Sequence, residues 1–205
     1  MARETTLATV WLMTLKMLET QGIDVDRLMR EIGVPPEALR QPDARLPSRL
    51  SDRAFERALS AIDDPAFGLT AARCWHPSNL GTLGFAWLSC VTLRRGLRRM
   101  ELFFNLLVTC FSYTGFVDPD GFRFVYDHGR GDAEIGWPMA DFTLSIIIDM
   151  CRTNAGERLV PRRVCLRRPQ PADAAPYLAF FGGEVLFGQK EDSFLLDEAT
   201  ADAIL

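Results

Sequence analysis

The sequence predicts an α+β fold in a single domain, with N-terminal helices, a central antiparallel β-meander, and then mixed helices and short strands. Apolar residues recur with helical spacing over the first hundred residues. From Phe111 to Tyr126 they alternate with polar or small residues, which is strand periodicity. After that the two patterns mix, without a linker or a repeat, and such an order is typical of α+β proteins.

The composition is that of a globular chain large enough to bury its own core. The 205 residues correspond to one domain, of which 48% are apolar and 24% charged. A net charge of −4 argues against a chain that binds polyanions along its whole length. The longest apolar stretch, Leu102 to Val117, contains polar residues and falls short of the roughly 20 apolar residues of a membrane span. Without a signal-peptide pattern, we expect a cytoplasmic protein with no membrane partner.

The first half is expected to be helical, because caps and breakers separate its amphipathic stretches. Asp24 and Thr92 are good N-caps, and Gly22 and Gly33 are good stops. The stretch from Leu83 to Ser89 is apolar almost all round, which predicts a buried helix. The expected helices are Thr6–Gln21, Val25–Ile32, one from Ser48 or Ser51 to the break at Asp63, Pro65 to about Arg73, Leu83–Ser89 and Leu93 to about Leu107, with a short turn at Pro35–Leu39.

The β-meander is expected around a turn at Val117–Phe122. In this turn Asp118 bonds its own backbone, Pro119 presets φ, and Gly121 takes a positive φ. A third strand is expected at Ala133–Trp137. The remaining expected elements are a helix from Pro138 to about Thr153, a strand at Val164–Arg168, a helix at Ala172–Phe181, short strands at Val185–Phe187 and Phe194–Leu196, and a last helix from Glu198.

No motif for catalysis, metal binding or nucleotide binding occurs in the sequence. The five cysteines contain no CxxC pair, so we interpret them as small buried apolar residues. The acidic residues between 118 and 141 lack calcium-loop spacing. We therefore predict no catalytic residue, metal or cofactor. One enzymatic alternative stays open, a small Cys/His enzyme that uses Cys110 or His128.

Two arginine clusters raise the question of phosphate contacts. On a helix, Arg94, Arg95, Arg98 and Arg99 form one basic face, which we interpret as a solvated face that pairs with acids such as Glu101. The second cluster brackets a strand, and alternation sends its members to opposite faces. Its members are Arg162, Arg163, Arg167 and Arg168. Neither cluster contains the two-helix unit of a DNA-reading motif.

Several segments in order resemble the N-terminal, arabinose-binding-like domain of AraC/XylS-type bacterial transcriptional regulators. The resemblance covers about residues 23–205. It rests on the order and spacing of the segments, which belong to the scaffold and not to a ligand site. The segments are Gly22–Val25, Ile32–Pro35, Pro42–Pro47, Asp64–Leu69, Gly81–Ala86 with Ser89, Thr92–Leu93, Phe180–Gly183, Val185–Gly188 and Ser193–Asp197.

This resemblance implies an effector-binding and dimerisation domain over residues 1–205. In such regulators a C-terminal pair of helix-turn-helix units reads DNA, and the given sequence stops at Leu205 before any such unit. We therefore expect a homodimer that binds a small-molecule effector and reaches DNA only through a domain missing here. The alternative within the same class is a ligand-free protein-interaction module, which predicts a filled interior.

Effector pockets are usually apolar with a few polar groups, so aromatic residues near the meander are the candidates for a binding site. An effector carboxylate has three candidate partners, Arg73, Arg123 and His76. The candidate lining residues are Trp75, His76, Phe85, Trp87, Phe111, Tyr113, Tyr126, Trp137 and Phe142.

Overall fold

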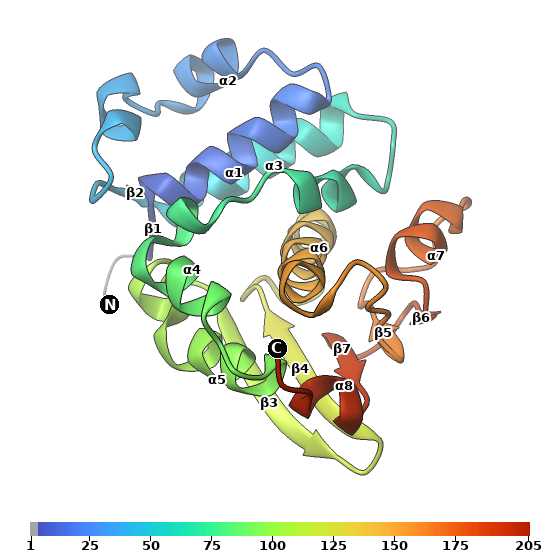
Figure 1. Cartoon of the computed structure of the whole chain (residues 1–205). Coiled ribbons are helices and arrows are strands. Elements are labelled where there is room, and N and C mark those ends of the chain that lie inside the picture. Colours follow the sequence, from blue (N-terminus) through green and yellow to red (C-terminus); the bar gives the residue numbers. More distant parts are fainter. Residues whose placement is uncertain (1–3) are drawn as a thin grey trace.

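The computed structural model describes residues 4–205 and confirms the α+β class (Figure 1). Its main sheet has five strands in the order β3-β4-β7-β5-β6. Neighbouring strands are antiparallel except β5 and β6, which are parallel. The strands are β3 (Ser112–Asp118), β4 (Gly121–Asp127), β5 (Arg163–Cys165), β6 (Glu184–Leu186) and β7 (Asp192–Leu196).

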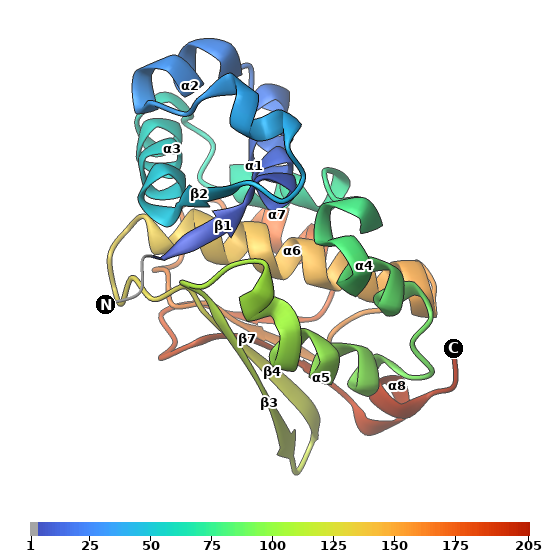
Figure 2. The ribbon, with the colours of Figure 1, turned by 90° about the vertical axis from the view of Figure 1, so that its left-hand side faces the viewer.

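Helices make up most of the rest, and α6 lies at the centre. It runs between the N-terminal helices on one side and the main sheet on the other (Figures 1 and 2). The α-helices are α1 (Ala8–Thr20), α2 (Val25–Ile32), α3 (Ser48–Ala61), α4 (Gly81–Leu88), α5 (Leu93–Phe103), α6 (Gly136–Ala155), α7 (Ala175–Phe181) and α8 (Glu198–Asp202). Short 3₁₀ helices are η1 (Pro36–Arg40), η2 (Phe67–Arg73), η3 (Pro77–Leu80) and η4 (Phe104–Leu106).

The central position of α6 explains why its sequence has no helical periodicity. Of its 20 residues, 14 are buried, because neighbours pack on it from nearly all sides. A helix of this kind is apolar all round, so its length and not its pattern identifies it. The expected helix from Pro138 to Thr153 is therefore confirmed and extends slightly at both ends.

Capping and turn chemistry at the expected positions is also confirmed. Asp24 Oδ1 accepts a hydrogen bond from the Arg27 amide at 2.9 Å, and the Thr92 side chain accepts one from Arg95. In the hairpin turn, Asp118 Oδ1 accepts from the Asp120 amide at 3.2 Å. These interactions are local, so the sequence alone specifies them.

The expected third meander strand at Ala133–Trp137 is wrong. These residues form a turn that leads into α6, and the strand next to β4 is β7, from the end of the chain. Gly136 lies under the His128 ring, where an added Cβ would come within 2.2 Å of the ring. β4 pairs with β7, which lies far from it in the sequence, and the periodicity of a strand does not indicate which distant strand it pairs with.

Three further differences concern the N-terminal half. Residues 67–73 form a 3₁₀ helix and not an α-helix. The helix expected at Leu83–Ser89 is present as α4, but Phe85 and Leu88 are exposed, because α4 packs mainly through Gly84 and Trp87. A two-stranded sheet of β1 (Thr5–Leu7) and β2 (Arg45–Pro47) was not expected, since three-residue strands carry almost no periodicity.

Within residues 4–205, no helix combines the length and the apolar character needed to cross a bilayer.

Candidate functional site

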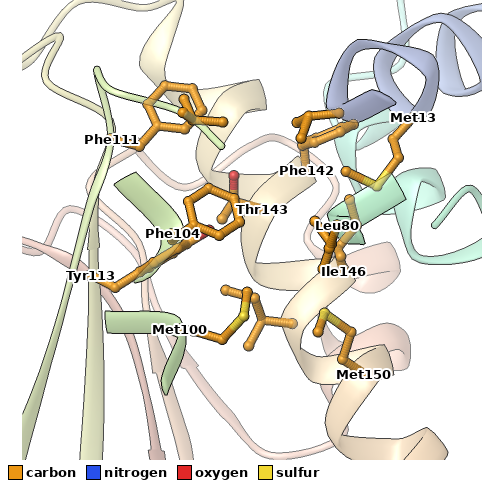
Figure 3. A pocket seen from close by; sticks show the side chains of 13 residues that line it. Met13, Leu80, Met100, Phe104, Phe111, Tyr113, Phe142, Thr143, Ile146 and Met150 are labelled. Carbon is orange, nitrogen blue, oxygen red and sulfur yellow. The ribbon is translucent and has the colours of Figure 1, made fainter. Parts of the chain in front are cut away.

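An apolar cavity lies between α1, α5, α6 and β3 (Figure 3). Its volume is about 30 Å³. Only Tyr113 and Thr143 bring polar side-chain atoms to a lining that is otherwise apolar. The lining residues are Val10, Met13, Leu80, Met100, Phe104, Val108, Phe111, Tyr113, Phe142, Thr143, Ile146, Ile147 and Met150.

Regular secondary structure places these side chains. On α6, Phe142, Ile146 and Met150 are four residues apart and therefore share one stripe of the helix. Phe111, just before β3, and Tyr113, in β3, are two residues apart and both line the cavity. One stripe of α6 and one side of the strand thus face the same space.

Aromatic rings form the wall of the cavity on the sheet side. Tyr113 stacks on Phe124 at 5.3 Å between ring centroids and meets Phe104 edge-on at 4.8 Å. Tyr126 lies behind, 5.6 Å from Tyr113 and 5.5 Å from Phe111. Burial raises the pKa of Tyr113 and of Tyr126 far above its usual value, so both hydroxyls stay neutral. The wall therefore offers apolar surface and neutral hydroxyl groups, and no charge.

The cavity in this state has the volume of roughly two water molecules. Small-molecule sites typically measure about 300–1,000 Å³, so an effector would need side chains to move. Met13, Met100 and Met150 are suited to that, because a methionine side chain is unbranched and changes rotamer easily. The aromatic search of the sequence missed these methionines, although all three lie on apolar helix faces.

The structure brings some of the sequence-predicted site residues together. Phe111, Tyr113 and Phe142 line the cavity, and Tyr126 packs directly behind them. Trp87 is buried below the cavity, and its indole Nε1 donates to the Met150 carbonyl at 3.0 Å. These residues lie together because hairpin, α4 and α6 pack around one interior.

The other four sequence-predicted residues lie elsewhere. His76 is exposed and caps η3 through its Nδ1. Phe85 is 56% exposed on α4, and Trp137 is half-buried at the start of α6. Trp75 donates its indole Nε1 to Asp149 Oδ2 at 2.7 Å, which places it beside a second concave region.

That second region is an open polar groove of about 710 Å³ between the end of α1, η2, α6 and α7. Acidic and basic side chains both line this groove. Its lining residues are Thr20, Gln21, Asp64, Ala66, Leu69, Thr70, Ala72, Arg73, Asp149, Arg152, Pro176, Ala179 and Phe180. It therefore offers hydrogen-bonding groups and charges, in contrast to the cavity on the other side of α6.

A buried polar cluster fixes one end of this groove. Asp141 Oδ2 accepts hydrogen bonds from Arg168 at 2.6 Å and from the Tyr177 hydroxyl at 2.7 Å. Arg168 Nη1 also donates to the Pro65 carbonyl at 2.8 Å, and the Tyr177 hydroxyl oxygen lies 3.0 Å from that carbonyl. Burial raises the pKa of Asp141 to about 7, although Arg168 and Tyr177 act to lower it. The cluster ties α6, α7 and the segment before η2 to one another.

The geometry does not assemble a Cys/His dyad at Cys110 and His128. His128 Nδ1 accepts from the Arg130 amide at 3.1 Å, and its Nε2 faces Asp192 Oδ2 at 3.6 Å. Burial raises the pKa of the Cys110 thiol and lowers the pKa of His128. A thiol that stays protonated is a poor nucleophile. Among residues 4–205, no hydrogen bond joins Cys110 to His128, and no His, Cys, Asp and Glu cluster suits a metal ion.

Seven of the eight arginines in the two clusters bond to other groups of the fold, and Arg95 is exposed. On α5, Arg94 pairs with Asp202 of α8 at 2.7 Å, and Arg98 pairs with Glu101 at 2.7 Å, as expected from the helix face. In the second cluster each arginine meets its own acid. These pairs are Arg162–Asp120, Arg163–Glu184, Arg167–Asp132 and Arg168–Asp141. The basic groups therefore connect elements and do not form one basic surface.

The comparisons with known proteins agree with this α+β architecture. The model of the family described as "Arabinose-binding domain of AraC transcription regulator, N-term" matches residues 22–205, and the chain belongs to this family. The class is thus a regulatory domain of AraC-type transcription regulators.

One similar solved structure is the transcriptional regulator CdpR from Pseudomonas aeruginosa, with a TM-score of 0.66 and 19% sequence identity. The match covers 96% of the present chain and 57% of the CdpR chain, so this chain spans a little over half of that regulator. At this identity the likeness concerns the fold. A comparison with curated proteins gives no match.

Proposed function

We propose that this chain senses a small-molecule effector, forms a homodimer, and controls an attached DNA-binding domain in the cytoplasm. Its membership of the AraC-type family over residues 22–205 supports the regulatory class. Effector binding would act by favouring one of two arrangements of the regulator, which requires that the effector bind one arrangement more tightly.

The observation that carries the sensing role is the apolar cavity at the centre of the domain. It contacts α1, α5, α6 and β3, so a ligand that enlarges it would move elements from both halves of the chain. The neutral Tyr113 and Thr143 hydroxyls are its polar groups. We therefore propose that the effector is a small uncharged molecule that is mostly apolar and has one hydrogen-bonding group. Phe111, Tyr113 and Phe142 would contact it directly.

Thermal unfolding of the purified domain against a panel of small uncharged metabolites tests this proposal. A ligand at 100 times its Kd stabilises the folded state by about 2.7 kcal/mol. Thr143→Val removes the hydroxyl and keeps the shape, so it should weaken binding. Leu178→Ala, on the exposed side of α7, is the matched control and should leave binding unchanged. Lack of any stabilising compound, or equal binding by Thr143→Val, would argue against this site.

A ligand-free interaction module is the second candidate, and two observations favour it. The cavity is small, and Phe85, Leu102 and Leu106 expose apolar side chains on α4, α5 and η4. Sedimentation of the unliganded domain separates the two candidates. A dimer that dissociates when Leu102 and Leu106 are changed to Glu, in a protein that no compound stabilises, would favour the interaction module.

A further inference from the structure

The open groove beside α7 has the features of a binding site that is separate from the cavity. Its volume of about 710 Å³ lies within the usual range for small-molecule sites. Its four charged side chains are two acids and two arginines, so its net charge is zero. They are Asp64, Arg73, Asp149 and Arg152. A groove with this balance does not favour a polyanion, but it offers partners to both ends of a molecule that carries one charge of each sign.

Arg152 is the cation that the fold places most firmly in the groove. Its Nε donates to the Leu159 carbonyl at 3.1 Å, and its Nη2 donates to the Phe180 carbonyl at 2.7 Å. Its Nη1 makes no hydrogen bond to any residue in 4–205, and no acid within that range forms an ion pair with it. Burial lowers its pKa from the ordinary value, with Asp149 acting in the opposite direction. The guanidinium is thus held in place while one of its nitrogens has donor capacity left.

Asp149 is the corresponding anion, one helical turn before Arg152 on α6. The Trp75 indole donates to its Oδ2 at 2.7 Å, which orients the carboxylate, and its Oδ1 accepts no hydrogen bond from the described residues. On the segment around η2, Asp64 and Arg73 are both exposed. Asp64 Oδ1 accepts a hydrogen bond from the Ala66 amide at 2.8 Å. Helix α6 and the segment around η2 therefore each contribute one acid and one arginine to the lining.

The walls of the groove are fixed before any ligand arrives. Arg168 donates to the Pro65 carbonyl, and the Tyr177 hydroxyl lies 3.0 Å from it, so the segment of Asp64 is held against the start of α7. Arg152 binds the Phe180 carbonyl, so the end of α7 is held against α6. A site that is already organised loses little conformational entropy on binding.

We propose that this groove binds a small zwitterion, whose carboxylate pairs with Arg73 and Arg152 and whose ammonium group pairs with Asp64 and Asp149. Charge-assisted hydrogen bonds of this type are the strong ones, and a guanidinium matches a carboxylate geometrically. The site does not depend on an effector in the cavity. Because Asp149 and Met150 are consecutive on α6, the two sites share one helical turn.

Calorimetric titration of the domain with ω-amino acids, from glycine to ε-aminocaproate, tests this inference. These probes vary the separation between carboxylate and ammonium. For γ-aminobutyrate, butyrate and butylamine are the matched single-charge compounds. We expect at least one zwitterion to bind with a Kd of about 1 mM or lower, and its single-charge relatives to bind at least about tenfold more weakly.

Charge-removing variants then locate the binding. Arg73→Gln removes an exposed cation, and Asp149→Asn removes a charge while its amide oxygen still accepts from Trp75. Each substitution should weaken binding of the zwitterion by about tenfold, whereas Arg95→Gln, on the exposed side of α5, should not change binding. The cavity variant Thr143→Val should also leave it unchanged, which separates this site from the proposed effector cavity.

Three results would overturn the inference. They are absence of binding for every zwitterion, equal binding of butyrate and γ-aminobutyrate, and binding that neither Arg73→Gln nor Asp149→Asn weakens. Circular dichroism of both variants shows that they are folded, so a loss of binding reports on the groove.

Discussion

The two sides of α6 differ in what they present to a ligand. One side carries Phe142, Ile146 and Met150 into a small apolar cavity (Figure 3). The other carries Asp149 and Arg152 into an open groove with charges of both signs. The cavity side is lined almost wholly by apolar side chains, which leave a space of about 30 Å³. The groove side is open, and its polar groups are oriented by neighbouring backbone and by Trp75.

This difference determines at which of the two sites the protein must rearrange to bind a ligand. A ligand in the cavity must displace packed side chains, which costs conformational strain but gains apolar burial. A ligand in the groove replaces water at groups that are already oriented, so it needs no movement of the walls. The buried cluster around Asp141, near the start of α6, holds the scaffold that both sides require.

The largest expected effect comes from breaking that cluster. Asp141→Ala leaves the Arg168 guanidinium buried without its carboxylate and removes an acceptor from Tyr177. The free energy of unfolding should fall by about 3–5 kcal/mol, because an uncompensated buried charge is costly. Urea unfolding measures this. Glu157→Ala, in an exposed loop, is the control. A loss below about 1 kcal/mol would mean that the cluster does not hold the scaffold.

The next largest expected effect is a loss of stability when a side chain on the cavity side of α6 is shortened. Met150→Ala removes a fully buried side chain and enlarges the cavity, so unfolding should become easier by about 2–5 kcal/mol. Met150→Leu keeps the volume and should cost less than about 1.5 kcal/mol. The comparison is made by urea unfolding. Equal losses of stability in the two variants would show that the volume of the side chain at position 150 does not determine how much it stabilises the cavity wall.

A pH effect is expected at the sheet side of the molecule, at Asp192. Burial raises the pKa of Asp192 to about 6 from an ordinary value near 3.8. The folded chain then binds this proton more tightly than the unfolded chain, so the associated stability is complete below about pH 4 and is lost as pH rises through about 6. Asp192→Asn removes this titration.

Urea unfolding of both proteins between pH 4 and 8 tests the effect. The difference in the free energy of unfolding, wild type minus Asp192→Asn, should fall with rising pH by an amount on the order of 3 kcal/mol. Burial lowers the pKa of His128, so its own contribution has the opposite sign. Because its Nε2 lies 3.6 Å from Asp192 Oδ2, the measured difference belongs to the coupled pair. A difference that does not change with pH would show that Asp192 has an ordinary pKa.

The smallest expected effect is on the groove side. Arg73 is exposed and forms no ion pair with a residue in 4–205, so Arg73→Gln should change the free energy of unfolding by less than about 0.5 kcal/mol. Thermal unfolding of the unliganded domain checks this. A larger loss would show that the charge serves the fold, and the contrast between the two sides of α6 would weaken.

Local signals in the sequence predicted much of the fold. The side chains of Asp24, Thr92 and Asp118 accept hydrogen bonds from backbone amides a few residues away. Because these contacts are local, the two helix caps and the turn could be predicted from the sequence. The helix from Pro138 was identified by its length. The strand expected at Ala133–Trp137 failed because β4 takes β7 as its neighbour, and the exposure of Phe85 was missed because an apolar helix does not reveal how much of it is covered.

For the candidate sites, the sequence indicated the aromatic part of the cavity and little else. Phe111, Tyr113 and Phe142 were among the candidate lining residues and lie together in the cavity wall, whereas Met13, Met100 and Met150 were not among the candidates. Arg73 was among the candidates for pairing with a carboxylate. Arg152, the second arginine of the groove, was not a candidate. Its hydrogen bonds go to backbone carbonyls of Leu159 and of α7, and the sequence around position 152 does not indicate these contacts.

By itself the sequence determined the α+β class, the caps and turns, and membership of the AraC-type family, because these rest on local chemistry and on the order of segments. The tertiary structure decided the order of strands, the burial of the Asp141 cluster, and the placement of a small apolar cavity and an open groove on two sides of one helix. These features depend on contacts between residues far apart in the chain, and their energies follow from burial and distance, which a linear pattern does not contain.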